Sequence, residues 1–162
     1  MQGKDITYDL TYIPEKICMG GIVTPGYISS TIADHHCDII RGDVIVQNWR
    51  GDATPLQHLM TITKIKGVLH VMDNEELKDL SFFSGLKEID SGSEEQRAAL
   101  IISNNSALKE LLLVSLTRVE SPASATVVMK NNPKLVVEKE ELYECFEKEQ
   151  SAREYGSSVL RG

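Results

Sequence analysis

The sequence predicts an all-β solenoid of about four coils with short capping helices. Four repeats share one pattern, in which a small residue precedes two alternating aliphatic residues, a turn and, in the last three repeats, a Leu after an Asn-centred turn. A second apolar register runs through three of the coils. Only 6% of the chain is aromatic, so the core must be built mainly from Leu, Ile and Val, which suits stacked strands. The repeats begin at Gly42, Gly67, Ala98 and Ala125.

The composition is that of a soluble globular protein, and 162 residues are the size of one domain. The net charge of -7 argues against nucleic-acid and anionic membrane partners, because both are bound through an excess of Lys and Arg. Residues 1–10 lack the charged and then apolar pattern of a signal peptide, and no apolar stretch approaches the ~20 residues of a membrane span. We expect neither in this chain.

A short amphipathic helix is predicted over residues 26–36, where Tyr27, Ile28 and Ile32 would cover one end of the core. An open solenoid end would otherwise expose core and strand edges. Within the repeats, strand alternation points one set of aliphatic residues inward. The predicted inward columns are Val44, Leu69, Leu100, Val127 and Val46, Val71, Ile102, Met129, and the second register is Leu59, Ile62, Ile65, then Phe83, Leu86, Ile89, then Leu113, Leu116, Val119.

Asn74, Asn105 and Asn132 hold the same turn position in three successive repeats. An inward Asn at a tight corner can satisfy backbone groups that the bend leaves unpaired. We therefore predict a structural Asn ladder rather than three exposed turn residues. Trp49 takes this position in the first repeat, so the ladder would be one rung short.

Three features are predicted after the second repeat. Residues 91–96 lengthen the third coil as a surface insertion. Residues 138–149 have helical spacing at Leu142, Cys145 and Phe146 and would form the second cap, and residues 151–162 read as a flexible tail.

The order of Cys18, a short helix, Cys37, the run IIRGDVIV and repeats ending NNSAL and NNPKL resembles the receptor L domain of the insulin and epidermal growth factor receptors. It is most similar to free-standing nematode L-domain proteins. The resemblance covers residues 18–142 and places a receptor L domain at 18–150, after an N-terminal extension over residues 1–17. It implies a right-handed parallel β-helix with leucine-rich-repeat-like coils, an extracellular location, and binding of polypeptide ligands without catalysis.

The resemblance also implies a disulfide between Cys18 and Cys37, which would tie the helical cap to the first coil. Relatives often carry a cysteine after the final NNPxL, where this chain has Val136. We interpret Cys145 as a buried free thiol, and a bond to a second chain or a missing segment is the alternative.

The outward side of the repeat strands is the main candidate for binding. An apolar run on an exposed sheet marks an interaction surface or a face covered by another part of the chain, and the sequence shows no second layer. We therefore favour a ligand-binding face. Its central column is Ile45, His70, Ile101 and Val128, flanked by Gln47, Met72, Ser103 and Lys130.

The tripeptide Arg-Gly-Asp occurs twice. The copy at 41–43 lies where a repeat opens, so we interpret it as a strand start. The copy formed by Arg50, Gly51 and Asp52 lies in a turn-rich loop before Pro55 and is a candidate adhesion loop.

Other motifs are weaker indications of function. Asp34, His35, His36 and Cys37 have metal-ligand chemistry, but neighbours on a short helix point in different directions, so we expect no metal site. Asn104 opens a glycosylation sequon that matters if the chain is secreted. No catalytic motif is present, His58 and His70 lack catalytic partners, and we expect no cofactor.

We therefore favour a non-enzymatic, extracellular or secreted protein that binds a polypeptide ligand or another ectodomain. The alternative is an intracellular leucine-rich-repeat scaffold, which free thiols at Cys18 and Cys37 would favour. A polysaccharide-degrading β-helix enzyme ranks last, because four coils are too few for the usual substrate groove and no cluster of Asp with Arg or Lys recurs on one face.

Overall fold

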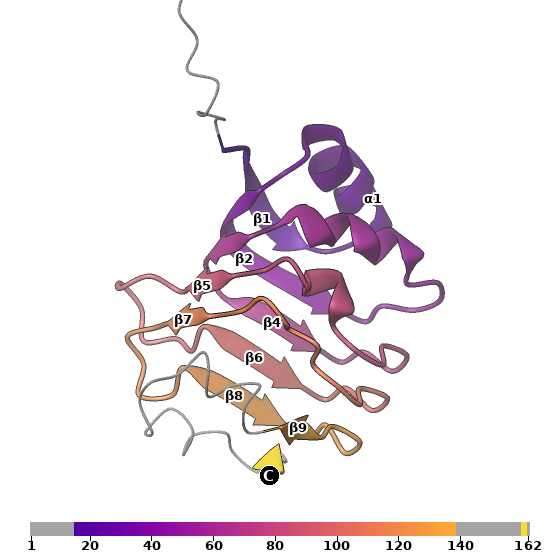
Figure 1. Cartoon of the computed structure of the whole chain (residues 1–162), viewed down its shortest axis with the longest axis vertical. Helices are drawn as coiled ribbons and strands as arrows, with labels where there is room; N and C mark the ends of the chain where they lie inside the picture. Colours follow the sequence, from indigo (N-terminus) through magenta and orange to yellow (C-terminus); the bar gives the residue numbers. More distant parts are fainter. Residues whose placement is uncertain (1–14, 139–159, 162) are drawn as a thin grey trace, which may run out of the picture.

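The computed structural model describes residues 15–138 and 160–161, and its main element is an eight-stranded parallel sheet curled into half a barrel (Figure 1). The strands lie in the order β7-β5-β3-β2-β4-β6-β8, and β1 also pairs with β2. The predicted class, a mostly β, solenoid-like fold, is confirmed. The strands of this sheet are β1 Ile17–Ile22, β2 Ile39–Gln47, β3 Lys64–Lys66, β4 Leu69–Met72, β5 Glu88–Asp90, β6 Leu100–Ser103, β7 Arg118–Glu120 and β8 Val127–Lys130.

β2 joins the two arms of the sheet. Its residues 39–41 pair with β3, and its residues 44–47 pair with β4, so Gly42 and Asp43 lie at the corner between the arms. Gly42 has φ +116°, a conformation that favours glycine, and a Cβ on Gly67 of the next repeat would collide with the Gly42 carbonyl oxygen. The predicted strand start at Gly42 is therefore a bend inside a strand that begins at Ile39.

The predicted core is confirmed. Both inward columns of the β2, β4, β6 and β8 arm are in register, and every member is at most 1% exposed. In the other arm Ile65, Ile89 and Val119 are paired in register and buried. The remaining members of the second apolar register are buried as well.

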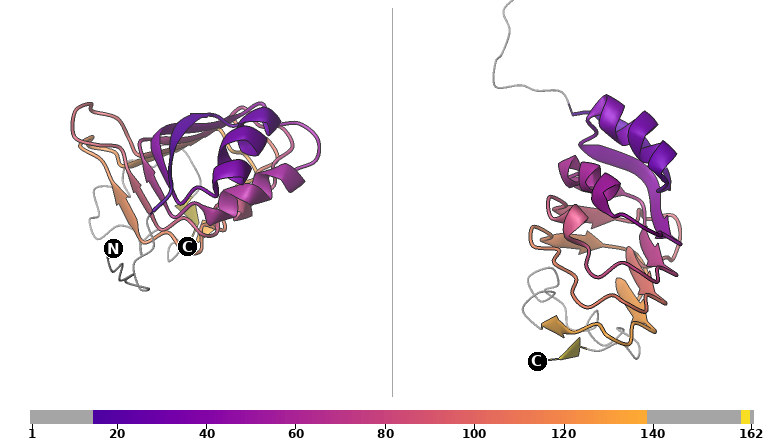
Figure 2. Two further views of the ribbon diagram at one scale, coloured as in Figure 1. Left: turned by 90° about the horizontal axis from the view of Figure 1, so that it is seen from above. Right: turned by 90° about the vertical axis from the view of Figure 1, so that its right-hand side faces the viewer.

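One continuous helical segment covers the N-terminal end of this core, as predicted (Figure 2). It consists of α1 Pro25–Tyr27 and the π-helical turn η1 Ile28–Ala33. Thr24 caps its start, because the Thr24 hydroxyl oxygen accepts the Tyr27 N–H at 3.0 Å. Ile28 and Ile32 of this segment are buried against the core.

Two 3-10 helices follow on the same side of the curled sheet, η2 Thr54–Thr61 and η3 Ser81–Phe83. η2 packs against both η1 and η3. β9 Val137–Glu138 and β10 Leu160–Arg161 form a separate parallel pair. The predicted helix at 138–149 lies outside the described residues except for Glu138, and so does Cys145. Of the predicted tail, only residues 160–161 are described.

The Asn ladder is present at the corner that follows β4, β6 and β8. The Oδ1 atom of Asn105 accepts the backbone N–H and the Nδ2 group of Asn74 at 3.2 and 2.9 Å, and Asn132 does the same for Asn105 at 3.1 and 2.9 Å. Each Nδ2 also donates to a backbone carbonyl in the strand of the preceding repeat; these carbonyls belong to Val46, Val71 and Ile102. In the first repeat the Trp49 N–H donates to Asn74, so the ladder ends there.

A second column, which the sequence analysis missed, stands beside the ladder. The residue before each ladder position is in the left-handed region, with φ between 53° and 59°, and is Asn or Asp in every repeat: Asn48, Asp73, Asn104 and Asn131. These two residue types tolerate that conformation better than other non-glycine residues. The corner therefore combines a left-handed turn residue with an inward amide.

Replacing Asn105 by Ala should lower the free energy of unfolding by about 2–4 kcal/mol, because each buried donor or acceptor left unsatisfied costs ~1–3 kcal/mol. Chemical denaturation would measure this loss. Asn104→Gly is the matched control, since it changes the exposed neighbour and keeps a residue suited to positive φ. Equal losses in the two variants would contradict a structural role for the ladder.

Candidate ligand-binding face

The eight predicted face residues lie together on the outward side of β2, β4, β6 and β8. Ile45, His70, Ile101 and Val128 are aligned in register and half-buried, although no second layer of the described chain covers them. Gln47, Met72 and Ser103 beside them are also half-buried, and Lys130 is exposed. We call these eight residues the outward face.

β1 adds a fifth row that the sequence analysis missed. Ile22 pairs with Ile45, which extends the apolar column by one strand, and Ile22 is 48% exposed. β1 precedes the repeats and breaks its register near Gly20, so repeat alignment could not find it. Its one signal in the sequence was the short apolar run that ends at Val23.

The outer side of the other arm has the opposite character. All its outer positions carry charged side chains; the row Lys64, Glu88 and Arg118 alternates in sign from strand to strand, and Lys64 pairs with Glu88 at 3.4 Å. Ion pairs at a surface that water reaches contribute little stability. The outer residues of β3, β5 and β7 are Lys64, Lys66, Glu88, Asp90, Arg118 and Glu120.

A bidentate ion pair borders the outward face at the β2 corner. Nη1 and Nη2 of Arg97 donate to the Asp43 carboxylate at 2.6 and 3.2 Å, and the Val68 N–H donates to it at 2.9 Å. Burial raises the pKa of Asp43, but the hydrogen bonds from Arg97 and Val68 outweigh burial and hold this pKa below its usual 3.8. The carboxylate of the first Arg-Gly-Asp is thus already engaged within the domain.

His70 occupies the middle of the apolar column, between Ile45 and Ile101. Burial lowers the pKa of His70 below its usual 6.5, Arg97 also lowers it, and Asp43 raises it. The imidazole is therefore mainly neutral at pH 7. A neutral ring in this place keeps the column free of charge.

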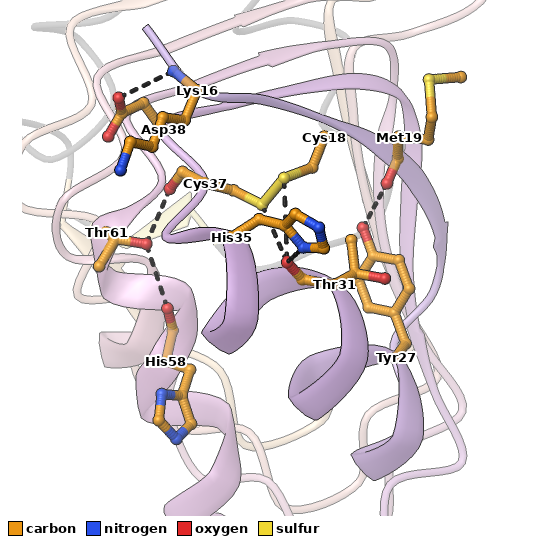
Figure 3. Close-up of a disulfide and its surroundings, with 10 residues drawn as sticks. All are labelled: Lys16, Cys18, Met19, Tyr27, Thr31, His35, Cys37, Asp38, His58 and Thr61. Atoms are coloured by element: carbon orange, nitrogen blue, oxygen red, sulfur yellow. Dashed lines mark hydrogen bonds between the residues drawn. A yellow bond between two sulfur atoms is a disulfide. The ribbon is translucent and has the colours of Figure 1, made fainter. Parts of the chain in front are cut away.

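The disulfide between Cys18 and Cys37 is present and joins β1 to the connection between the helical segment and β2 (Figure 3). The Thr31 carbonyl oxygen lies 3.3 Å from the Cys37 sulfur, and the Thr61 hydroxyl donates to the Cys37 carbonyl at 2.8 Å. Closing a loop of this length contributes roughly 3 kcal/mol in the chain-entropy model. The bond fixes the strand that carries Ile22.

The second Arg-Gly-Asp lies on an exposed loop, and its groups have local partners. Arg50 is 3.4 Å from Glu75, and the Asp52 carboxylate accepts the Thr54 N–H and hydroxyl at 3.0 and 2.7 Å. These hydrogen bonds lower the pKa of Asp52. Gly51, with φ +80°, has open space around it. The adhesion role stays a prediction.

The remaining candidates have simple outcomes. Cys37 is in the disulfide, and the His35 ring lies 3.2 Å from the Thr31 carbonyl. Across the described part of the chain, no group of three metal-ligating side chains comes together, and no helix is long and apolar enough to cross a membrane. Asn104 is exposed on the turn that follows β6.

Comparison with protein families finds a match to the family model described as Receptor L domain, over residues 36–145. The match includes every repeat and all eight residues of the outward face. A search of curated proteins finds no similar sequence.

Asp43→Asn should reduce stability most near neutral pH. A carboxyl whose pKa is lowered by folding contributes stability above its unfolded pKa and loses that contribution as pH falls through the folded value. The difference in unfolding free energy between wild type and variant should therefore shrink as pH falls below 3.8. Thermal denaturation across pH measures it, with Glu94→Gln, which removes an exposed carboxylate three residues before Arg97, as control. A difference that stays constant with pH would show that the carboxylate is not held by Arg97.

Proposed function

The chain belongs to the receptor L domain family, and from this membership we propose that it is a non-enzymatic extracellular domain that binds a polypeptide ligand or another ectodomain through the outward face. Receptor L domains are typically extracellular ligand-binding domains.

The contrast between the two outer sides of the sheet carries the proposal. Both arms share one core, yet only one of them presents an aligned, largely uncharged column to solvent. Apolar side chains aligned on a rigid sheet lose little conformational freedom on binding, so their contact area converts efficiently into affinity. The charged arm would instead lose ion pairs and hydration in a complex.

The disulfide supports the extracellular location. Disulfides persist in oxidising compartments and are rare in the reducing cytosol. Cys18 and Cys37 are both buried, and their bond fixes the first strand beside the repeats. These observations favour the extracellular binding protein over the intracellular scaffold.

We also infer that the repeats wind as a right-handed solenoid of about four coils. Every strand pairing in the sheet is parallel, and each repeat with strands in both arms visits the same two arms in turn. Connections between parallel strands of one sheet are right-handed in nearly all proteins. The second Arg-Gly-Asp is a secondary binding candidate, because an integrin would have to draw Asp52 away from Thr54.

Replacing Ile45, His70 or Ile101 by Asp should abolish binding to a ligand recovered from a screen of extracellular polypeptides, because each change buries a charge in the complex. Surface plasmon resonance would measure affinity, and circular dichroism would confirm that each variant folds. Val114→Asp is the matched control, since it places the same charge on a residue that is 74% exposed and outside the outward face. Unchanged affinity in all three face variants would exclude this face.

Binding through the outward face should weaken as pH falls through the pKa of His70, which lies below the usual 6.5. A ligand that covers His70 favours the neutral ring, so it lowers the pKa of His70 further and is released on protonation. Affinity measured from pH 7.5 to 5 tests this. His70→Gln should lose the dependence, whereas His58→Gln, exposed on η2, should keep it. A pH dependence that survives in His70→Gln would assign it to other groups.

A further inference from the structure

The segment Asn104-Asn105-Ser106 is the one glycosylation sequon in the chain, and the fold assigns its two asparagines to different environments. Asn105 is 0% exposed and bonded within the ladder. Asn104 is exposed, with φ 58°, and its backbone N–H donates to the Lys130 carbonyl at 3.0 Å. The sequon asparagine can therefore carry a bulky group while the ladder beside it stays intact.

The position of Asn104 relates it to the outward face. It directly follows Ser103, which is aligned with Met72 on one side and Lys130 on the other. Neighbouring strands are ~4.8 Å apart, so Ser103 lies one strand spacing from both residues, and a substituent on Asn104, the next residue, stands beside this edge of the face. The opposite border of the face, at Asp43 and Arg97, lies at the other end of the strands.

We propose that Asn104 carries an N-linked glycan that covers the Met72, Ser103 and Lys130 edge of the outward face and leaves the central column from Ile22 to Ile101 for a ligand. This rests on the proposed function, because glycosylation requires passage through the secretory pathway. In the transfer, the Asn104 amide nitrogen bonds to the anomeric carbon of a lipid-diphosphate oligosaccharide. The bond from that carbon to the diphosphate breaks, the lipid diphosphate leaves, and the nitrogen loses one proton.

The glycan would act as a boundary that selects how a ligand lies on the face. A glycan is bulky and strongly solvated, so it excludes a partner from the surface next to its attachment. A ligand that needs the edge at Met72, Ser103 and Lys130 would be rejected. A ligand that follows the central column from Ile22 to Ile101 would be accepted.

The full chain, expressed behind a secretion leader in animal cells, allows a test without any ligand. Mass spectrometry of the secreted protein reads the occupancy of Asn104. Ser106→Ala is the comparator, because it removes the sequon, keeps Asn104 and changes an exposed side chain. Acetylation of Lys130 and peroxide oxidation of Met72 then report shielding, with Lys66 on the charged arm as internal control.

The expected result is an occupied Asn104, with Met72 and Lys130 labelled several-fold more slowly in the glycosylated protein than in Ser106→Ala, and Lys66 labelled equally in both. A bare Asn104 on the secreted protein, or equal labelling of Met72 and Lys130, would overturn the inference. Both outcomes leave the binding role of the face intact, and a failed ligand screen would leave the glycan result intact.

Discussion

The inward amides at one corner of each repeat hold the rest of the structure in place. Asn105 bonds to Asn74 on one side and Asn132 on the other, and it also reaches the Val71 carbonyl, so one side chain sets the relation among three repeats. Because the corner positions are fixed, the strands that lead into them are aligned residue by residue. The dry core and the aligned outward face are thus two consequences of the same buried polar chain.

The corner at Gly42 explains why the two arms differ outside while sharing a core inside. Glycines at 42 and 67 let adjacent backbones approach there, and Asp43 is turned toward Arg97 from a different repeat. On one side of this bend the outer positions carry paired charges. On the other the central column is mostly apolar and half-buried, which is stable in water only as a modest patch. A single strand, β2, therefore carries both surfaces.

Much of this architecture could be predicted from the sequence, because the repeats encode it locally. Val44 and Val46 have counterparts in each later repeat, and the Asn positions recur with them, so core, ladder and face could be read by alignment. The disulfide came only through family resemblance. β1 could not be predicted because it lies outside the repeats, and the Asp43–Arg97 pair joins residues 54 apart that share no pattern. The left-handed turn residues were missed because Asn and Asp are also common in ordinary turns, so their presence beside an inward Asn does not indicate a positive φ.

The stacking direction also has a mechanical consequence. Strands run across the long axis of the stack. A pull along that axis therefore loads the hydrogen bonds between one pair of repeats before those between the next pair. Tension would therefore peel repeats away singly from the β8 end, with each ladder bond as a discrete step. The cross-link between Cys18 and Cys37 keeps the segment between them from extending at the other end. A domain built this way would yield to tension in stages from one end while its first strand stays anchored.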